Sequence, residues 1–221
     1  MPTAIIFDFD GVLVDSEAHW PGLNVRIFER LEITRPWTKE YNDRIVGHGM
    51  ESVHRLLAAE YGLTMSLTEY ETIVWQEAIH VYDSLAMPIP GVVALLDRLK
   101  AAGIPMAIAS SNERDVIGET AARLGLDAYF GSVATKDDVP LGRIKPCPDI
   151  YLHAARGLGI APDECLAIED SPTGIAAAKA AGMTCIALHS LHNEAQDMSA
   201  ADIHIDGFDE LDDARLGSLL G

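Results

Sequence analysis

The sequence contains no apolar run of about 18 residues, the length that a single helix needs to cross a membrane. It opens directly on an apolar segment, MPTAIIFDFDG, which leaves no basic region and no small-residue cleavage site for a signal peptide. Hydrophobic residues make up 48% and charged residues 23% of the chain, as in ordinary globular proteins. We therefore expect a soluble cytoplasmic protein without a membrane partner.

Sequence patterns that indicate several common kinds of site are also missing. The three cysteines, Cys147, Cys165 and Cys185, are odd in number and form no CxxC pair, which argues against a disulfide framework and against a zinc site. No HExxH pattern occurs, and we assign no metal to His189 and His192 in HSLH. The absence of GxxxxGK[ST] and of GxSxG disfavours a nucleotide-binding kinase and a serine hydrolase.

Basic residues are few, because 16 lysines and arginines stand against 34 acidic residues and give a net charge of −18. Such a surface repels the phosphate backbone of nucleic acids, so we expect no nucleic-acid partner. The same charge repels a free phosphorylated metabolite. A site for such a molecule must therefore hold a cation or aim backbone N–H groups at the phosphate.

Short apolar segments alternate with amphipathic ones over most of the chain. The apolar runs predict buried strands at Thr3–Phe9, Ile104–Ala109, Cys165–Ile168 and Met183–Leu188, and weaker ones near Tyr129–Ala134 and Ile203–Ile205. Helical spacing predicts helices at Gly91–Ala102, Asp115–Leu124, Asp149–Leu158 and Pro172–Ala181, with C-cap signals at Gly103, Gly125, Gly159 and Gly182. This alternation predicts an α/β fold, a Rossmann-like core whose parallel sheet is covered on both faces.

Residues 16–87 break this rhythm. They carry helical patterns at Ala18–Leu31, Met50–Tyr61 and Leu67–Leu85 but no convincing buried strand, and Pro88, Pro90 and Gly91 mark the return to the core pattern. The sequence therefore predicts a core made of residues 1–15 and 88–221, with residues 16–87 inserted as a helical unit.

Polar residues follow the predicted strands where the strands end. These are Asp8-Phe9-Asp10-Gly11, Ser110-Ser111-Asn112 and Glu169-Asp170-Ser171, and Lys145 precedes a predicted helix. In an open parallel sheet the ligand crevice lies at the carboxyl ends of the strands, so we expect these groups to meet there. Four carboxylates, a hydroxyl and an ammonium group suit phosphoryl transfer. Carboxylates at this density repel one another without a hard cation, and oxygen ligands suit Mg²⁺.

Four segments, DFDGVLVDS, IASSN, RIKPCPD and AIEDSPTGIAAAKAAGM, resemble in this order the four motifs of the haloacid dehalogenase superfamily. The match spans nearly the whole chain, and the order and spacing of the motifs are more specific than any one of them. Residues 16–87 resemble the helical cap domain of the β-phosphoglucomutase-like branch, in which the cap closes over the crevice. The resemblance implies a magnesium-dependent phosphatase, a phosphoric monoester hydrolase.

The resemblance also assigns roles to the residues at the strand ends. It makes Asp8 the nucleophile that forms an aspartyl-phosphate, and Asp10 the general acid and base. Ser110, Lys145 and the backbone N–H groups of Phe9, Asp10 and Ser111 would bind the phosphoryl oxygens. Asp8, the backbone carbonyl of Asp10 and Asp170 would hold Mg²⁺, with Glu169 either as a further ligand or ordering the waters of the metal. His48 and Asn112 are candidates for substrate recognition.

The predicted partner is a small phosphorylated molecule, with sugar and polyol phosphates favoured over phosphoglycolate, nucleoside monophosphates and sugar acids. We expect a monomer or a weak dimer. Two other functions stay open: a β-phosphoglucomutase-type phosphotransferase, and a binding module that has lost catalysis. The mutase branch places a histidine ten residues after the second aspartate, where this chain has Trp20, with His19 one position away.

Overall fold

The structure, a computed structural model, describes residues 1–36, 38 and 50–220. The chain divides into two compact units, Met1–Glu17 with Met87–Gly221, called here the core unit, and Ala18–Ala86, called the helical unit. The segments that leave and re-enter the core unit are paired. The N–H group of Asp15 donates to the carbonyl of Met87 at 3.0 Å, and the N–H group of Met87 donates to Oδ1 of Asp15 at 2.6 Å.

Six strands form one parallel sheet in the core unit, in the order β3-β2-β1-β4-β5-β6. They are β1 (Ala4–Phe7), β2 (Met106–Ala109), β3 (Ser132–Ala134), β4 (Cys165–Glu169), β5 (Thr184–Leu188) and β6 (Ile203–Ile205). In this register Phe7 lies opposite Ile108 of β2 and Ile168 of β4. The residues that come after these three therefore emerge at the same level of the sheet, at its carboxyl edge.

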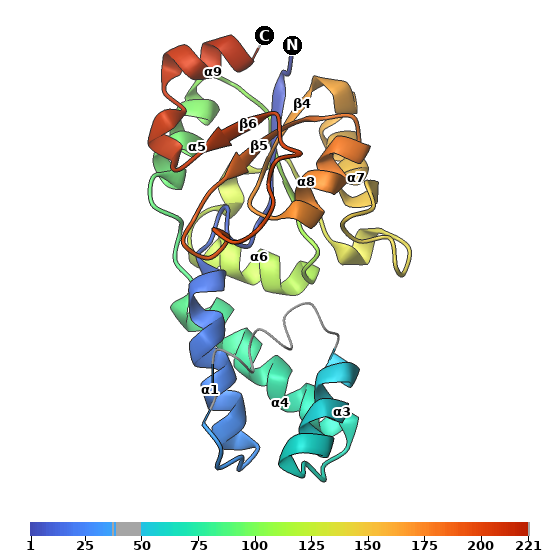
Figure 1. The fold of residues 1–221 in the computed structure, drawn as a ribbon. Coiled ribbons are helices and arrows are strands. Elements are labelled where there is room, and N and C mark those ends of the chain that lie inside the picture. Colours follow the sequence, from blue (N-terminus) through green and yellow to red (C-terminus); the bar gives the residue numbers. More distant parts are fainter. Residues whose placement is uncertain (37, 39–49, 221) are drawn as a thin grey trace. The chain divides into compact units, whose positions relative to one another are not determined.

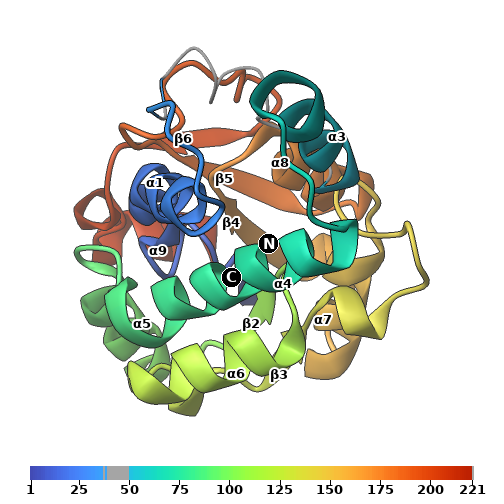
Figure 2. The same ribbon diagram turned by 90° about the horizontal axis from the view of Figure 1, so that it is seen from below.

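Helices cover both faces of the sheet. They are α5 (Val92–Ala101), α6 (Arg114–Arg123), α7 (Asp149–Leu158), α8 (Pro172–Ala180) and α9 (Asp213–Leu219). Figures 1 and 2 show α7 and α8 on one side of the sheet and α5 and α9 on the other. Buried residues of α7 and α8 pack against alternate strand residues, among them Ile6 and Ala167, in one continuous core. The predicted Rossmann-like core is confirmed.

The predicted helix ends and most predicted strands are also confirmed. Gly103, Gly125, Gly159 and Gly182 have φ values of 72°, 69°, 71° and 85°, as C-cap glycines do. The segment Tyr129–Ala134 forms a strand only over Ser132–Ala134, after a 3-10 turn at Asp127–Tyr129. The pattern did not predict α9, because seven residues are too few to show a clear helical period.

The helical unit contains α1 (Trp20–Arg30), α3 (Met50–Tyr61) and α4 (Leu67–His80), and a π-helical turn, Val81–Leu85, follows α4. Helix α4 packs against both α1 and α3. Ser66 and Glu69 form a capping box that starts α4, since each side chain bonds to the backbone N–H group of the other residue. No helix in the described part of the chain is long and apolar enough to cross a membrane.

Candidate active site

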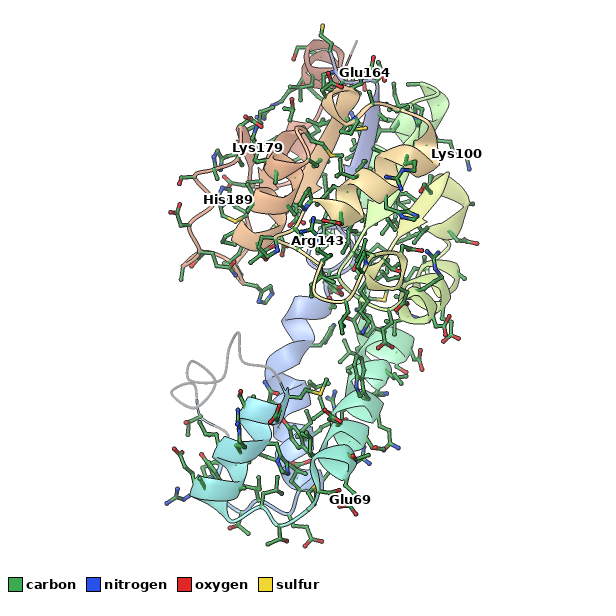
Figure 3. The ribbon with its side chains drawn as sticks, turned by 90° about the vertical axis from the view of Figure 1, so that its right-hand side faces the viewer. Glu69, Lys100, Arg143, Glu164, Lys179 and His189 are labelled. Atoms are coloured by element: carbon green, nitrogen blue, oxygen red, sulfur yellow. The ribbon has the colours of Figure 1, made fainter. Side chains whose placement is uncertain are left out.

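A buried lysine joins two carboxylates at the carboxyl edge of the sheet. Nζ of Lys145 donates to Oδ1 of Asp8 at 2.5 Å and to Oε1 of Glu169 at 2.6 Å. The three side chains are at most 10% exposed. Asp8 directly follows β1 and Glu169 ends β4, so two neighbouring strands bring the carboxylates together. In Figure 3 this edge of the core unit is the end where Arg143 and His189 are labelled, and Glu164, which precedes β4, lies at the other end.

Glu169 is surrounded by hydrogen-bond donors. Its Oε1 also accepts from the hydroxyl of Tyr151 at 2.8 Å. Its Oε2 accepts from the N–H groups of Asp170 and Ser171 at 3.1 and 3.3 Å, and from Oγ of Ser171 at 3.1 Å. A Cβ atom at position 174 would overlap with this carboxylate, so only Gly174 fits there. The carboxylate is therefore held from both sides and in turn holds Lys145.

The charges in this cluster shift one another's pKa values. Burial raises the pKa of Asp8 from 3.8 to about 8, against the opposing pull of the Lys145 ammonium group. Burial alone would lower the pKa of Lys145, but the carboxylates of Asp8 and Glu169 outweigh burial and raise it. Burial and the charge of Glu169 raise the pKa of Tyr151 well above its usual value. Lys145 thus stays a cation and Tyr151 a hydrogen-bond donor at neutral pH.

Three buried acidic residues form a site that could hold a metal ion. Asp8, Glu169 and Asp170 each offer an oxygen, and these atoms lie within 4.8 Å of one another. Gly11, with φ 75°, leaves space for this arrangement, because a Cβ atom there would overlap with Oδ2 of Asp170. An all-oxygen set of this kind fits a hard divalent cation such as Mg²⁺.

Asp10 lies beside this cluster, and two other polar side chains hold its carboxylate. Oγ of Ser16 donates to Oδ1 of Asp10 at 2.6 Å, and Nδ2 of Asn112 donates to Oδ2 at 3.3 Å. Asn112 is itself fixed, since its Oδ1 accepts from the N–H group of Glu113 at 2.8 Å. The predicted substrate residue Asn112 therefore contacts Asp10 in this structure.

The loop after β2 brings the predicted phosphate ligands to the same edge. Ser110 is 1% exposed, and its Oγ accepts from the N–H group of Asn112 at 3.0 Å. Within the described part of the chain, the N–H groups of Phe9 and Ser111 donate to no other backbone carbonyl. Oriented N–H groups and a hydroxyl can bind an anion at this edge.

Other predicted features lie elsewhere or outside the described residues. His48 lies outside them. His189 pairs with His204, since Nε2 of His189 lies 2.9 Å from Nδ1 of His204. Cys165 and Cys185 are buried thiols, and burial raises the pKa of Cys185 to about 12.

Three polar residues at the site were not identified from the sequence. Ser16 lies at the predicted start of the inserted unit, and Tyr151 lies in the apolar pattern of α7. Asn193 lies in the long connection between β5 and β6, and its Nδ2 bonds to the carbonyl of Asp170 at 2.9 Å. A tyrosine on the buried face of a helix is a usable signal, because a buried hydroxyl needs a partner. Nothing in the sequence around Asn193 marks it.

Comparison with known proteins gives the chain a family. A family profile described as haloacid dehalogenase-like hydrolase matches residues 2–182. The chain belongs to this family. A phosphorylated carbohydrates phosphatase of Thermotoga maritima is 33% identical to this haloacid dehalogenase-like hydrolase over 192 residues, which cover 86% of this chain and 87% of that protein.

Two further comparisons agree with this family. The β-phosphoglucomutase of Bacillus subtilis is 32% identical over 215 residues, 90% of this chain and 87% of that protein. A crystal structure of a HAD family hydrolase from Deinococcus radiodurans R1, with bound phosphate and sodium, has a TM-score of 0.77 at 30% identity and covers 99% of this chain and 97% of that chain. The predicted enzyme class, a phosphoric monoester hydrolase of the haloacid dehalogenase-like family, is confirmed.

Proposed function

We propose that this haloacid dehalogenase-like hydrolase is a magnesium-dependent phosphatase that uses Asp8 as its nucleophile. The observation that carries the proposal is the buried cluster of Asp8, Lys145, Glu169 and Asp170, with a fourth carboxylate, that of Asp10, held beside it by Ser16 and Asn112. The carboxylate of Asp8 thus lies among groups that can bind a cation. The carboxylate of Asp10 is oriented by hydrogen-bond donors, as a group that transfers a proton would be.

In the proposed first step, an oxygen of Asp8 attacks the phosphorus atom of the ester and forms an aspartyl-phosphate. Asp10 gives a proton to the departing alcohol oxygen, so that a neutral alcohol leaves. In the second step Asp10 takes a proton from a water molecule that attacks the same phosphorus. Asp8 then leaves as a carboxylate, and inorganic phosphate is released. Lys145, Ser110 and the N–H groups of Phe9, Asp10 and Ser111 bind the phosphoryl oxygens in both steps.

Asp8, Asp170 and the backbone carbonyl of Asp10 are the proposed ligands of Mg²⁺. When bound, Mg²⁺ would offset the negative charge of the carboxylates and of the phosphoryl group. For Glu169 we propose a positioning role, since both of its oxygens already accept hydrogen bonds from Lys145, Tyr151 and the start of α8.

Small sugar or polyol phosphates are the proposed substrate class, in keeping with the phosphorylated carbohydrates named for the Thermotoga maritima relative. We propose that residues 16–87, which include the helical unit, form the cap that recognises the alcohol part of the substrate. We include His48 among the residues proposed to recognise the substrate. The test is a screen in which phosphate release is measured from roughly a hundred metabolite phosphates with Mg²⁺, so that the panel covers alcohols whose size and polar groups a binding pocket can distinguish. Zero turnover across the panel with Mg²⁺ bound would favour the silent binding module.

A β-phosphoglucomutase activity is the second candidate, because the Bacillus subtilis relative carries that name. Both activities pass through an aspartyl-phosphate, but a mutase must keep water away from it and present a sugar hydroxyl instead. The two are separated by incubating the enzyme with β-glucose 1-phosphate and a trace of β-glucose 1,6-bisphosphate. Glucose 6-phosphate forming much faster than free phosphate contradicts the hydrolase, and phosphate release without isomerisation supports it.

A further inference from the structure

Asn193 is 2% exposed, although it lies in the irregular connection between β5 and β6. Polar side chains in such connections are usually solvated, and a buried carboxamide is unfavourable unless its N–H groups and its oxygen all find partners. Asn193 belongs to none of the four motifs, and the proposed chemistry does not use it.

All of the polar atoms of this side chain are hydrogen-bonded. Nδ2 donates to the carbonyl of Asp170 and to the carbonyl of Leu188, both at 2.9 Å. Oδ1 accepts from the N–H group of Ser190 at 2.8 Å. The amide therefore ties three backbone positions together, and one of them belongs to a proposed metal ligand.

These bonds lie where the sheet opens. The last ladder pair between β4 and β5 is Glu169 with Ala187, so Asp170 and Leu188 are the first residues beyond it. Leu188 still pairs with Ile205 of β6, but β4 and β5 no longer pair with each other at this level, because the ligand crevice of a parallel sheet opens where its strands end. Nδ2 of Asn193 supplies one donor to each of the two carbonyls and holds the strand ends together past the ladder.

Asp170 is consequently fixed from several directions. Its N–H group donates to Oε2 of Glu169 at 3.1 Å, its carbonyl accepts from Asn193, and its carboxylate lies against Gly11. With its backbone held at both ends, the side chain of Asp170 has little freedom to turn away from Asp8. Partners of this kind orient metal ligands and commonly change metal affinity by about 10–100-fold when they are removed.

We propose that Asn193 is a positioning residue for the metal site and acts through the backbone of Asp170. The proposal rests on the proposed function, because it takes Asp170 as a ligand of Mg²⁺. A purely structural role for Asn193, closing its own loop, would affect folding stability but leave the metal affinity of the folded protein unchanged.

The test compares Asn193→Leu and Asn193→Ala with the wild-type enzyme. Leu keeps a similar side-chain volume without donors, whereas Ala leaves space for a water molecule to reach the two carbonyls. Met198→Ala is the matched control, since it removes a buried side chain from the same connection without a bond to Asp170. Circular dichroism reports folding, and calorimetric titration reports the Kd for Mg²⁺.

We expect the Kd for Mg²⁺ to rise by about tenfold or more in both Asn193 variants, with kcat largely restored at saturating Mg²⁺. Met198→Ala should lower Tm and leave the Kd unchanged. A folded Asn193 variant whose Kd stays within about twofold of wild type overturns the proposal, given that lost orienting partners cost more than this. If wild-type enzyme itself binds no Mg²⁺, the proposed function fails instead.

A measurement on the wild-type enzyme covers the case in which neither variant folds. The side-chain amide signals of Asn193 in an ¹⁵N NMR spectrum should shift as Mg²⁺ is added and saturate with the Kd found by calorimetry. Amide signals that stay unchanged while the metal binds overturn the proposal, because the acceptor of this amide belongs to Asp170.

Discussion

The ammonium group of Lys145 lies 2.6 Å from Oε1 of Glu169 inside the core unit. Glu169 is fully buried, and its two carboxylate oxygens accept hydrogen bonds from Lys145, from the hydroxyl of Tyr151 and from the N–H group of Asp170. These donors balance the charge of the carboxylate. A buried ion pair of this kind contributes little net stability but orients its members. Glu169 therefore holds the ammonium group of Lys145 in place, and under the proposed function this is the position from which Lys145 would bind a phosphoryl group.

Glu169→Gln should weaken phosphate binding and destabilise the fold. Mg²⁺ affinity should change little if the carboxamide oxygen still accepts from the N–H group of Asp170, as Oε2 of Glu169 does. Whichever way the new carboxamide is turned, its NH₂ group faces another donor, so we expect a loss of roughly 2–4 kcal/mol in the free energy of unfolding. Competition by inorganic phosphate reports anion binding, and calorimetry reports the Kd for Mg²⁺. A large rise in that Kd with unchanged phosphate inhibition would instead make Glu169 a direct metal ligand.

Tyr151→Phe isolates one bond of this cluster. The variant keeps the ring that lies 5.1 Å from Nζ of Lys145 and removes only the hydroxyl that donates to Oε1 of Glu169. Because the buried oxygen keeps Lys145 as a partner, we expect a loss of about 1 kcal/mol in urea unfolding and a moderate rise in KM. Tyr129→Phe is a matched control, as its hydroxyl bonds to the exposed Asp97. Equal effects of the two variants on KM would contradict a role for Tyr151 in the site.

The strand ends were predictable because a parallel sheet needs continuous apolar runs, and the residues after each run emerge at the same edge. The sequence alone therefore predicts that Asp8, Ser110 and Asp170 lie close together. It does not reveal the bond between Lys145 and Asp8, since the two are 137 positions apart and only the loop before α7 determines their distance. Asn193 was also out of reach, because a buried asparagine in a loop has no sequence period.

Asp8→Asn should abolish turnover without unfolding the protein. An amide oxygen is too weak a nucleophile to form the aspartyl-phosphate, so kcat should fall by at least about a thousandfold, roughly 4 kcal/mol of transition-state stabilisation. Wild-type enzyme quenched during turnover of ³²P-labelled substrate should carry a hydroxylamine-labile label that the variant lacks. More than about a tenth of the wild-type kcat remaining in the variant, a loss below ~1.4 kcal/mol, contradicts the assignment.

Mg²⁺ binding should release a proton and strengthen as the pH rises from 6 to 8. A metal ligand must be ionised, and the pKa of Asp8 in the folded metal-free protein is raised to about 8. Calorimetry in two buffers with different ionisation enthalpies measures the proton released. An equal Kd at pH 6 and pH 8, with no proton release, would show that Asp8 is already ionised before the metal binds.

The same shift fixes the sign of a stability effect. The pKa of Asp8 is about 8 in the folded metal-free protein and 3.8 in the unfolded chain, so between pH 3.8 and about pH 8 the folded protein holds a proton that the unfolded chain has released. The contribution of this proton to folding stability is therefore complete below the pKa of the unfolded chain and is lost as the pH rises through the pKa of the folded protein. Asp8→Asn removes the titration, so the Tm of the metal-free variant should gain on the wild type as the pH rises toward 8.

Asn112→Leu should impair proton transfer more than substrate binding, because Nδ2 of Asn112 holds Oδ2 of Asp10 at 3.3 Å. General acid catalysis matters most for a poor leaving group, so kcat for an alkyl phosphate should fall by about tenfold, a part of the 10²–10⁴ that a positioned acid supplies. For p-nitrophenyl phosphate, whose leaving group needs no proton, kcat should change far less. Ser16→Ala removes a second donor to Asp10 and should show the same dependence on the leaving group. A loss of equal size for both esters, or a rise in KM confined to particular alcohols, would return Asn112 to the role predicted from the sequence, recognition of the substrate.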